Sequence, residues 1–126
     1  MARILVCDDE HAMRAFVARA FQMDGHFVSQ AEDGAHALEI MTADEPGFDL
    51  LLTDIRMPVM DGIALALAAA RDHPAVTILL MTGYADQRER AHGLDALIHD
   101  VITKPFSLAT MRAAVNEALG VAARAN

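Results

Sequence analysis

The sequence predicts a doubly wound α/β domain, in which helices cover both faces of a five-stranded parallel sheet. Apolar runs of strand length alternate along the chain with stretches whose apolar residues recur every three or four positions. The five strand candidates are residues 3–7, 26–30, 48–53, 77–81 and 98–103. Strict alternation favours right-handed crossovers, which make neighbouring strands parallel and put helices on both faces of the sheet.

Helical spacing between those runs predicts five helices. We expect them over residues 11–23, 34–43, 62–72, 86–96 and 108–122. Ser107 and Asp61 are candidate caps at the starts of the last and third helices, and Gly25 ends the first helix. The first helix should pack on the sheet through one apolar stripe, made of Met13, Phe16, Val17, Ala20 and Phe21.

Length and composition fit one domain. A chain of 126 residues that is 54% hydrophobic can bury one core but not two. We therefore expect a single domain over residues 1–121 and a short tail at 122–126, with no output domain. The longest apolar run, residues 63–70, is far shorter than the roughly 20 residues of a membrane span, so we expect a cytoplasmic protein without membrane contact.

The charge balance argues against nucleic acid as a direct partner. The chain has 18 acidic and 10 basic residues and a formal net charge of −8, which disfavours binding to phosphate backbones and anionic lipids. A downstream protein target fits this balance better. The single cysteine, Cys7, lies in an apolar run and is interpreted as a core side chain rather than a reactive thiol.

Polar residues suited to chemistry follow four of the five predicted strands. Asp8 and Asp9 follow the first strand, Asp54 the third, Thr82 the fourth and Lys104 the fifth. In an open α/β sheet, ligands bind beyond the carboxyl ends of the strands. We therefore expect these five side chains to meet at one edge of the sheet.

The three carboxylates would repel one another unless a cation lay between them. Ligation by oxygen alone suits Mg²⁺ or Mn²⁺, and such an ion keeps positions open for phosphoryl oxygens. Asp54 is the candidate nucleophile for phosphoryl transfer, because a carboxylate can form an acyl phosphate and the adjacent Asp8 and Asp9 more naturally serve the metal. Lys104 and Thr82 can neutralise charge on the phosphoryl oxygens.

Five short motifs occur in order along the chain. They are Cys7-Asp8-Asp9-Glu10, Thr53-Asp54-Ile55-Arg56-Met57-Pro58, Met60-Asp61-Gly62, Met81-Thr82-Gly83 and Thr103-Lys104-Pro105-Phe106. Over roughly residues 3–119, these motifs resemble the response-regulator receiver family of two-component signalling. The resemblance implies a flavodoxin-like fold with strand order 2-1-3-4-5 and, for this chain, a stand-alone switch in a phosphorelay.

The resemblance also implies a role for each site residue. It implies that a histidine kinase or a histidine phosphotransfer protein phosphorylates Asp54, with phosphate contacts from Thr82 and Lys104. It implies a cis peptide bond between Lys104 and Pro105. The implied ligands of Mg²⁺ are the carboxylates of Asp8, Asp9 and Asp54 and the backbone carbonyl of Arg56.

One position departs from the family pattern. Val101 stands where the family commonly has an aromatic residue that rotates inward on activation, so the usual relay from threonine to that aromatic ring is in doubt. Arg56 and Tyr84 lie two residues after Asp54 and Thr82 and are expected to set the lifetime of the phosphoryl group. Pro105 is also expected to modulate the site.

A narrower resemblance is to bacterial single-domain regulators of the CpdR type, and residues 82–91 and 97–101 carry it. It implies a phosphorylation-controlled adaptor for Clp-family proteolysis. The chain would then be a switch that gains and loses its phosphoryl group rather than a turnover enzyme.

Other interpretations stay open at this point. Asp8, Asp9 and Glu10 alone could simply favour the start of the first helix. A phosphatase acting through an aspartyl-phosphate would resemble the haloacid dehalogenase family, which needs a second Asp where this chain has Arg56. A flavin-binding module follows from fold analogy alone, although the acidic residues after the first strand would repel a flavin phosphate.

Overall fold

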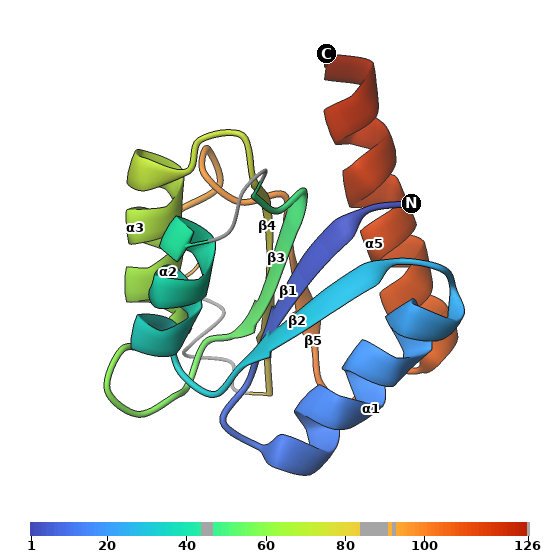
Figure 1. The fold of residues 1–126 in the computed structure, drawn as a ribbon, viewed down its shortest axis with the longest axis horizontal. Helices are drawn as coiled ribbons and strands as arrows, with labels where there is room; N and C mark the ends of the chain where they lie inside the picture. Colours follow the sequence, from blue (N-terminus) through green and yellow to red (C-terminus); the bar gives the residue numbers. More distant parts are fainter. Residues whose placement is uncertain (44–46, 84–90, 92, 126) are drawn as a thin grey trace.

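The computed structural model describes residues 1–43, 47–83, 91 and 93–125, and within them five strands and four helices (Figure 1). The strands are β1 (Arg3–Cys7), β2 (Phe27–Ala31), β3 (Leu50–Asp54), β4 (Thr77–Thr82) and β5 (Asp100–Thr103). The helices are α1 (His11–Met23), α2 (Gly34–Ala43), α3 (Gly62–Asp72) and α5 (Leu108–Ala125). In this part of the chain, no helix combines the length and the apolar character that a membrane span requires.

The five strands form one parallel sheet in the order β2-β1-β3-β4-β5. Helices α2 and α3 cover one face and α1 and α5 cover the other (Figure 1). The doubly wound α/β prediction is therefore confirmed, including the strand order. The order runs outward from β1 in both directions, so a crevice opens beyond the carboxyl ends of β1 and β3.

The inner strands are buried on both sides, which explains their continuous apolar sequences. Leu5 and Leu51 join the core beneath α2 and α3. Ile4, Leu50 and Leu79 join the core beneath α1 and α5. Packing on both faces of the sheet fixes the positions of these strands. It therefore also fixes the positions of the residues that follow them.

Several predicted boundaries shift by a few residues. β3 begins two residues later than predicted, and the ring of Phe48 packs instead under the Arg3 guanidinium, 5.3 Å from its centroid. β5 also begins two residues late, because Ile98 donates its N–H to the Leu94 carbonyl within a turn. α5 runs on to Ala125. Most of the helix predicted over 86–96 lies outside the described residues, but residues 93–97 form turns, so its predicted end is wrong.

The predicted caps are confirmed. The Asp61 carboxylate accepts from the Ala64 N–H at 2.9 Å and begins α3. The Ser107 hydroxyl accepts from the Thr110 N–H at 3.0 Å and begins α5. These side chains satisfy helix N–H groups that have no partner within the helix.

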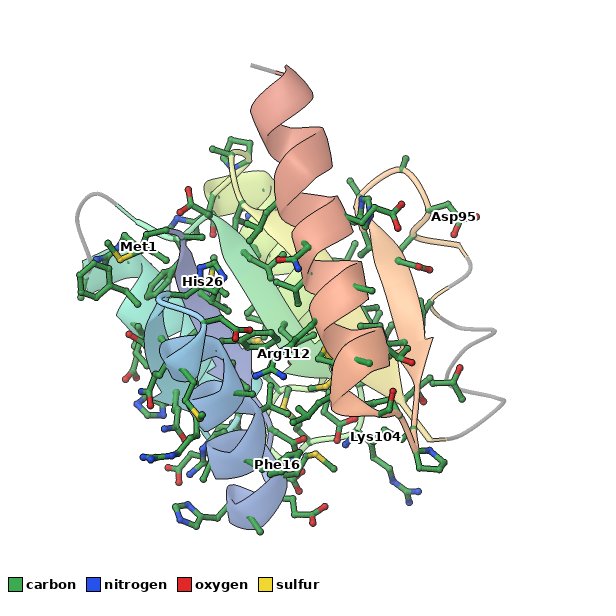
Figure 2. All side chains as sticks on the ribbon, turned by 90° about the vertical axis from the view of Figure 1, so that its right-hand side faces the viewer. Met1, Phe16, His26, Asp95, Lys104 and Arg112 are labelled. Carbon is green, nitrogen blue, oxygen red and sulfur yellow. The ribbon has the colours of Figure 1, made fainter. Side chains whose placement is uncertain are left out.

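The predicted apolar stripe of α1 is wrong at Phe16, which is 56% exposed. The predicted Val17, Ala20 and Phe21 are buried, and so is Ala18, which the prediction left out. The buried arc is centred between Val17 and Phe21, and Phe16 lies about a third of a turn from that centre, beyond the edge of the arc. Figure 2 shows Phe16 on α1 near the end of the molecule that carries Lys104.

Gly62 allows α3 to begin directly against the end of β3. Its N–H donates to the Ile55 carbonyl at 2.7 Å. A Cβ at this position would overlap the carbonyl oxygen of Asp54 and would lie 2.8 Å from the Cα of Ile55. The residue that follows Asp61 must therefore lack a side chain for Asp54 to keep its place.

We expect Gly62→Ala to lower the free energy of unfolding by about 1–3 kcal/mol, because the added methyl group displaces the backbone of Asp54. Urea unfolding followed by circular dichroism measures this change. Gly93→Ala is the matched control, since a Cβ there meets nothing within 4 Å. Equal stability of the two variants would contradict the close-approach argument.

Candidate functional site

The predicted site residues come together at the carboxyl edge of the sheet. Asp8 follows β1, Asp54 ends β3, Thr82 ends β4, and Lys104 follows β5. A cleft opens at this edge, lined by Asp9, Glu10, Asp54, Arg56, Gly83 and Lys104. Tyr84 lies outside the described residues.

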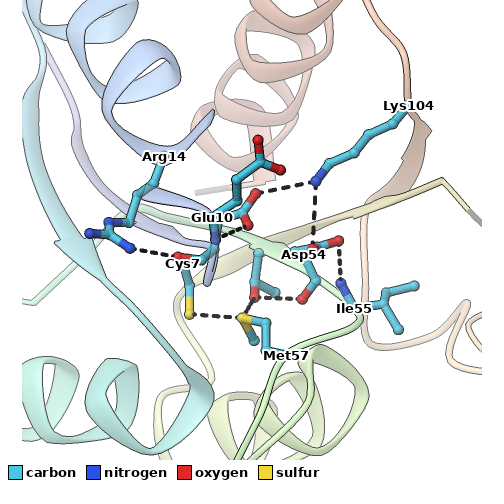
Figure 3. Close-up of polar contacts among 9 residues, drawn as sticks. Cys7, Glu10, Arg14, Asp54, Ile55, Met57 and Lys104 are labelled. Atoms are coloured by element: carbon cyan, nitrogen blue, oxygen red, sulfur yellow. Dashed lines mark hydrogen bonds and ion pairs between the residues drawn. The ribbon is translucent and has the colours of Figure 1, made fainter. Parts of the chain in front are cut away.

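Asp8 is buried, and each of its polar atoms has a partner. Its N–H donates to the Ala31 carbonyl at 3.1 Å, and its own carbonyl accepts from Arg14 Nη1 at 2.8 Å. One carboxylate oxygen accepts from the Glu10 N–H at 3.0 Å, and the other accepts from Lys104 Nζ at 3.2 Å (Figure 3). The carboxylate therefore has a single defined orientation toward the cleft.

Lys104 links the carboxylates of Asp8 and Asp54. Its Nζ lies 3.2 Å from Asp8 Oδ2 and 3.5 Å from Asp54 Oδ2. Burial lowers the pKa of Lys104, but the carboxylates of Asp54 and Asp8 outweigh this effect and raise the pKa above its ordinary value. Lys104 is therefore a fixed positive charge in the cleft.

The pKa of Asp54 is raised to about 6. Burial is the largest cause, and the positive charge of Lys104 opposes it. The nearby negative charge of Asp8 raises the pKa further, while a hydrogen bond of 3.0 Å from the Ile55 N–H to Asp54 Oδ1 lowers it. Without a second cation, ionised Asp54 is less stable in this site than in water.

The donor set fits a divalent cation. One oxygen from each of Asp8, Asp9 and Asp54 lies within 4.8 Å of the other two. Three carboxylates so close together carry more negative charge than Lys104 alone neutralises. Hard oxygen ligands at an open cleft are the environment that Mg²⁺ or Mn²⁺ prefers. Arg56 lines the same cleft, where its backbone carbonyl is the expected further ligand.

Thr82 and Lys104 are joined through the main chain. Thr82 is almost fully buried, and its carbonyl accepts from the Lys104 N–H at 2.7 Å. The peptide bond between Lys104 and Pro105 is cis, as the family resemblance implies. The ends of β4 and β5 therefore lie side by side at the edge of the sheet that carries the cleft.

Buried contacts of Cys7, Thr53 and Met57 lie next to Asp54. The thiol of Cys7 lies 3.5 Å from the Met57 sulfur, and the Thr53 hydroxyl donates to the Asp54 carbonyl at 2.9 Å (Figure 3). Burial raises the pKa of Cys7 to about 12, which agrees with its interpretation as a core side chain. These contacts tie the loop after β3 to β1.

The simpler interpretation of the first acidic run, as acids that favour the start of α1, does not explain where the Asp8 carboxylate lies. Glu10 occupies the N-cap position of α1 but makes no side-chain capping hydrogen bond. The carboxylate of Asp8 faces Lys104 and Asp54 instead. Sequence reasoning missed Arg14, whose side chain reaches the carbonyl of Asp8. The signal available was a basic residue near a helix N-terminus, where the helix dipole disfavours it.

Comparison with known proteins points to one family. The family described as "Response regulator receiver domain" matches residues 4–116. Response regulator MprA of Mycobacterium ulcerans is 38% identical over 106 residues, which are 84% of this chain and 45% of that protein. MprA of Mycobacterium leprae is 35% identical over 117 residues, 93% of this chain and 50% of that protein. The chain thus spans about half the length of the curated relatives it matches.

Solved structures agree. A CheY-like receiver domain protein from Methanospirillum hungatei has a TM-score of 0.92 at 25% identity and covers 100% of this chain and 99% of its own. Response regulator TrrA from Thermotoga maritima, solved in complex with Mg²⁺ and BeF, has a TM-score of 0.81 at 27% identity and covers 94% and 99%.

We expect Asp54→Asn to stabilise the metal-free protein at pH 7.5 by about 1–3 kcal/mol. The folded-state pKa of about 6 exceeds the ordinary value of 3.8 for an aspartate side chain, so the folded protein holds this proton more tightly. The stability that Asp54 contributes is complete below about pH 4 and is lost as the pH rises through 6. Unfolding in EDTA at pH 4 and pH 7.5 measures the difference between the two proteins.

The stabilisation should therefore be large at pH 7.5 and small at pH 4. Asp72→Asn is the control, because Asp72 lies on the surface at the end of α3, where substitutions change stability little. An Asp54→Asn effect of the same size at both pH values would contradict the raised pKa.

Proposed function

Because the chain belongs to the response-regulator receiver domain family, we propose that it accepts a phosphoryl group on Asp54 and thereby changes which proteins it binds. The position of Lys104 supports this proposal most directly. Its Nζ lies 3.2 Å from Asp8 Oδ2 and 3.5 Å from Asp54 Oδ2, at the edge of the cluster of three carboxylates. Phosphorylation and Mg²⁺ binding are typical of this family.

The reaction asks Asp54 to act as a nucleophile. A carboxylate oxygen of Asp54 attacks the phosphorus of a phosphohistidine, the P–N bond breaks, and the electron pair remains on the imidazole nitrogen. Receiver domains typically interact with histidine kinases or phosphotransfer proteins, and such a protein would be the donor. With its pKa raised only to about 6, Asp54 would be mostly ionised at pH 7 and so could attack without a separate base.

The groups around Asp54 would neutralise the negative charge of the phosphoryl oxygens. Lys104 offers a fixed ammonium, and Thr82 ends the neighbouring strand with a hydroxyl. Asp8 and Asp9, with Asp54 and the Arg56 carbonyl, would hold Mg²⁺, which when bound supplies further positive charge against the phosphoryl oxygens. TrrA, solved with Mg²⁺ and BeF, is a relative with the same fold and supports this assignment.

We expect acetyl phosphate with Mg²⁺ to add one phosphoryl group to the wild-type protein and none to Asp54→Asn, because the amide cannot form an acyl phosphate. Intact-protein mass spectrometry measures the addition. Asp72→Asn, which removes an exposed carboxylate from the end of α3, should be modified like the wild type. Equal labelling of Asp54→Asn and wild type would overturn the proposal.

We propose a switch rather than a turnover enzyme. Position 56 is Arg, so the second Asp of a haloacid dehalogenase-type phosphatase is absent from this sequence. Arg56 instead lines the cleft. Sustained hydrolysis of a generic phosphate ester, over many turnovers per protein molecule, would favour the phosphatase alternative.

The proposed output is a protein contact, with a Clp-family protease as the target, in the cytoplasm. Support comes from the resemblance of residues 82–91 and 97–101 to CpdR-type regulators and from the net charge of −8. Val101 packs, partly buried, against the core beneath α2 and α3. It offers no aromatic ring to rotate, so the signal would pass through Lys104 and its main-chain contact with Thr82.

We expect a Clp unfoldase to be captured by only one phosphorylation state of this protein. Pull-downs with wild type, before and after treatment with acetyl phosphate and Mg²⁺, measure this difference, and Asp54→Asn fixes the unmodified state. Capture that is the same in all three samples, or absent from all, would contradict the adaptor proposal. The assignment of Asp54 as acceptor would be unaffected by that result.

A further inference from the structure

Arg14 is a basic side chain directly behind the acidic cluster. It lies in the second turn of α1 and is half-buried. Its guanidinium reaches back toward the helix N-terminus, where Nη1 donates to the carbonyl of Asp8 at 2.8 Å. Figure 3 shows this contact on the side of β1 opposite Lys104.

Two further contacts hold the guanidinium in this position. Nε donates to the side-chain oxygen of Gln30, at the end of β2, at 3.3 Å. Nη2 lies 3.0 Å from Nδ1 of His11. The planar group thus joins α1, β2 and the loop after β1, and its partners are uncharged atoms rather than carboxylates.

The carbonyl that Arg14 binds belongs to the peptide unit between Asp8 and Asp9. The two residues on either side of this unit both contribute oxygens to the carboxylate cluster. Rotation of the peptide plane would move the Asp9 carboxylate relative to that of Asp8. Because Gln30 and His11 also hold the guanidinium of Arg14, its hydrogen bond to the Asp8 carbonyl opposes such rotation.

The acidic cluster attracts the guanidinium of Arg14 in the metal-free protein, but the charge of Arg14 works against metal binding at this location. The N-terminus of a helix carries a partial positive charge, so a guanidinium near it is unfavourable. A divalent cation among the carboxylates would add a further repulsion. The contact with Asp8 therefore points to a role in geometry rather than in charge.

We propose that Arg14 is a positioning residue for metal binding, which aligns the Asp8 and Asp9 carboxylates by holding the peptide between them. The inference rests on the proposed function in one respect, namely that the ion bound is Mg²⁺. Arg14 does not touch the metal or the phosphoryl group, and it acts through the main chain of Asp8. The predicted consequence is tighter Mg²⁺ binding than the same carboxylates would give without it.

The sign of the change in Mg²⁺ affinity separates this role from an electrostatic one. Loss of a positioning contact weakens Mg²⁺ binding, typically by about tenfold or more. Loss of a nearby positive charge alone would strengthen it. Arg14→Gln removes both the charge and the fork of donors, so the two roles predict opposite results.

Isothermal titration of Mg²⁺ into the purified chain measures the affinity. We expect Arg14→Gln to bind Mg²⁺ about tenfold more weakly than wild type. Arg19→Gln is the matched control, because Arg19 is exposed on the same helix and its substitution makes the same charge change. We expect Arg19→Gln to bind Mg²⁺ like the wild type or slightly more tightly.

Arg14→Lys gives a second test that does not depend on the folding of Arg14→Gln. Lys keeps the charge but cannot hold Asp8, Gln30 and His11 together. We expect it also to weaken Mg²⁺ binding, with a melting temperature in EDTA close to that of wild type. Unchanged affinity in Arg14→Lys, or tighter binding in Arg14→Gln, would overturn the inference. Failure of the wild type to bind Mg²⁺ would instead overturn the proposed metal site.

Discussion

Repulsion among three carboxylates, held within 4.8 Å of one another, is the constraint on which the rest of the site depends. Asp8 is fully buried and the side chain of Asp54 is 13% exposed, so charge in this cluster needs a compensating charge from the protein or a bound cation. Lys104 supplies one such charge from the end of β5. The ends of β1, β3 and β5 must therefore lie close together at one edge of the sheet. The close packing of Gly62 against Asp54 keeps Asp54 in place at that edge.

In the proposed function, the same constraint would link phosphorylation of Asp54 to a change elsewhere in the molecule. The same lysine contacts both carboxylates and is tied to Thr82 through the main chain. A phosphoryl group on Asp54 would place new negative charge beside Lys104 and so alter the balance of its contacts. The residues that follow, from Pro105 into α5, would carry this change to a surface.

The site residues could be predicted because each of them lies at or just after the end of a short strand with an apolar sequence. Asp8, Asp54, Thr82 and Lys104 were placed correctly at one edge, although strand starts shifted by up to two residues. Local contacts were harder to predict. Phe16 was predicted to be buried because it follows the helical spacing of the apolar residues of α1. That spacing does not show how wide the buried arc of the helix is. Arg14 was missed because a basic residue near a helix N-terminus does not by itself show that its side chain binds a backbone carbonyl.

The identity of the acceptor is tested most directly by locating the modified residue. Borohydride reduces an aspartyl-phosphate to homoserine, so the protein is phosphorylated with acetyl phosphate and Mg²⁺, reduced, digested and sequenced by tandem mass spectrometry. Homoserine at position 54, and at neither Asp8 nor Asp9, is the predicted result. Homoserine at position 8 or 9, or at none of the three, would contradict the assignment of Asp54.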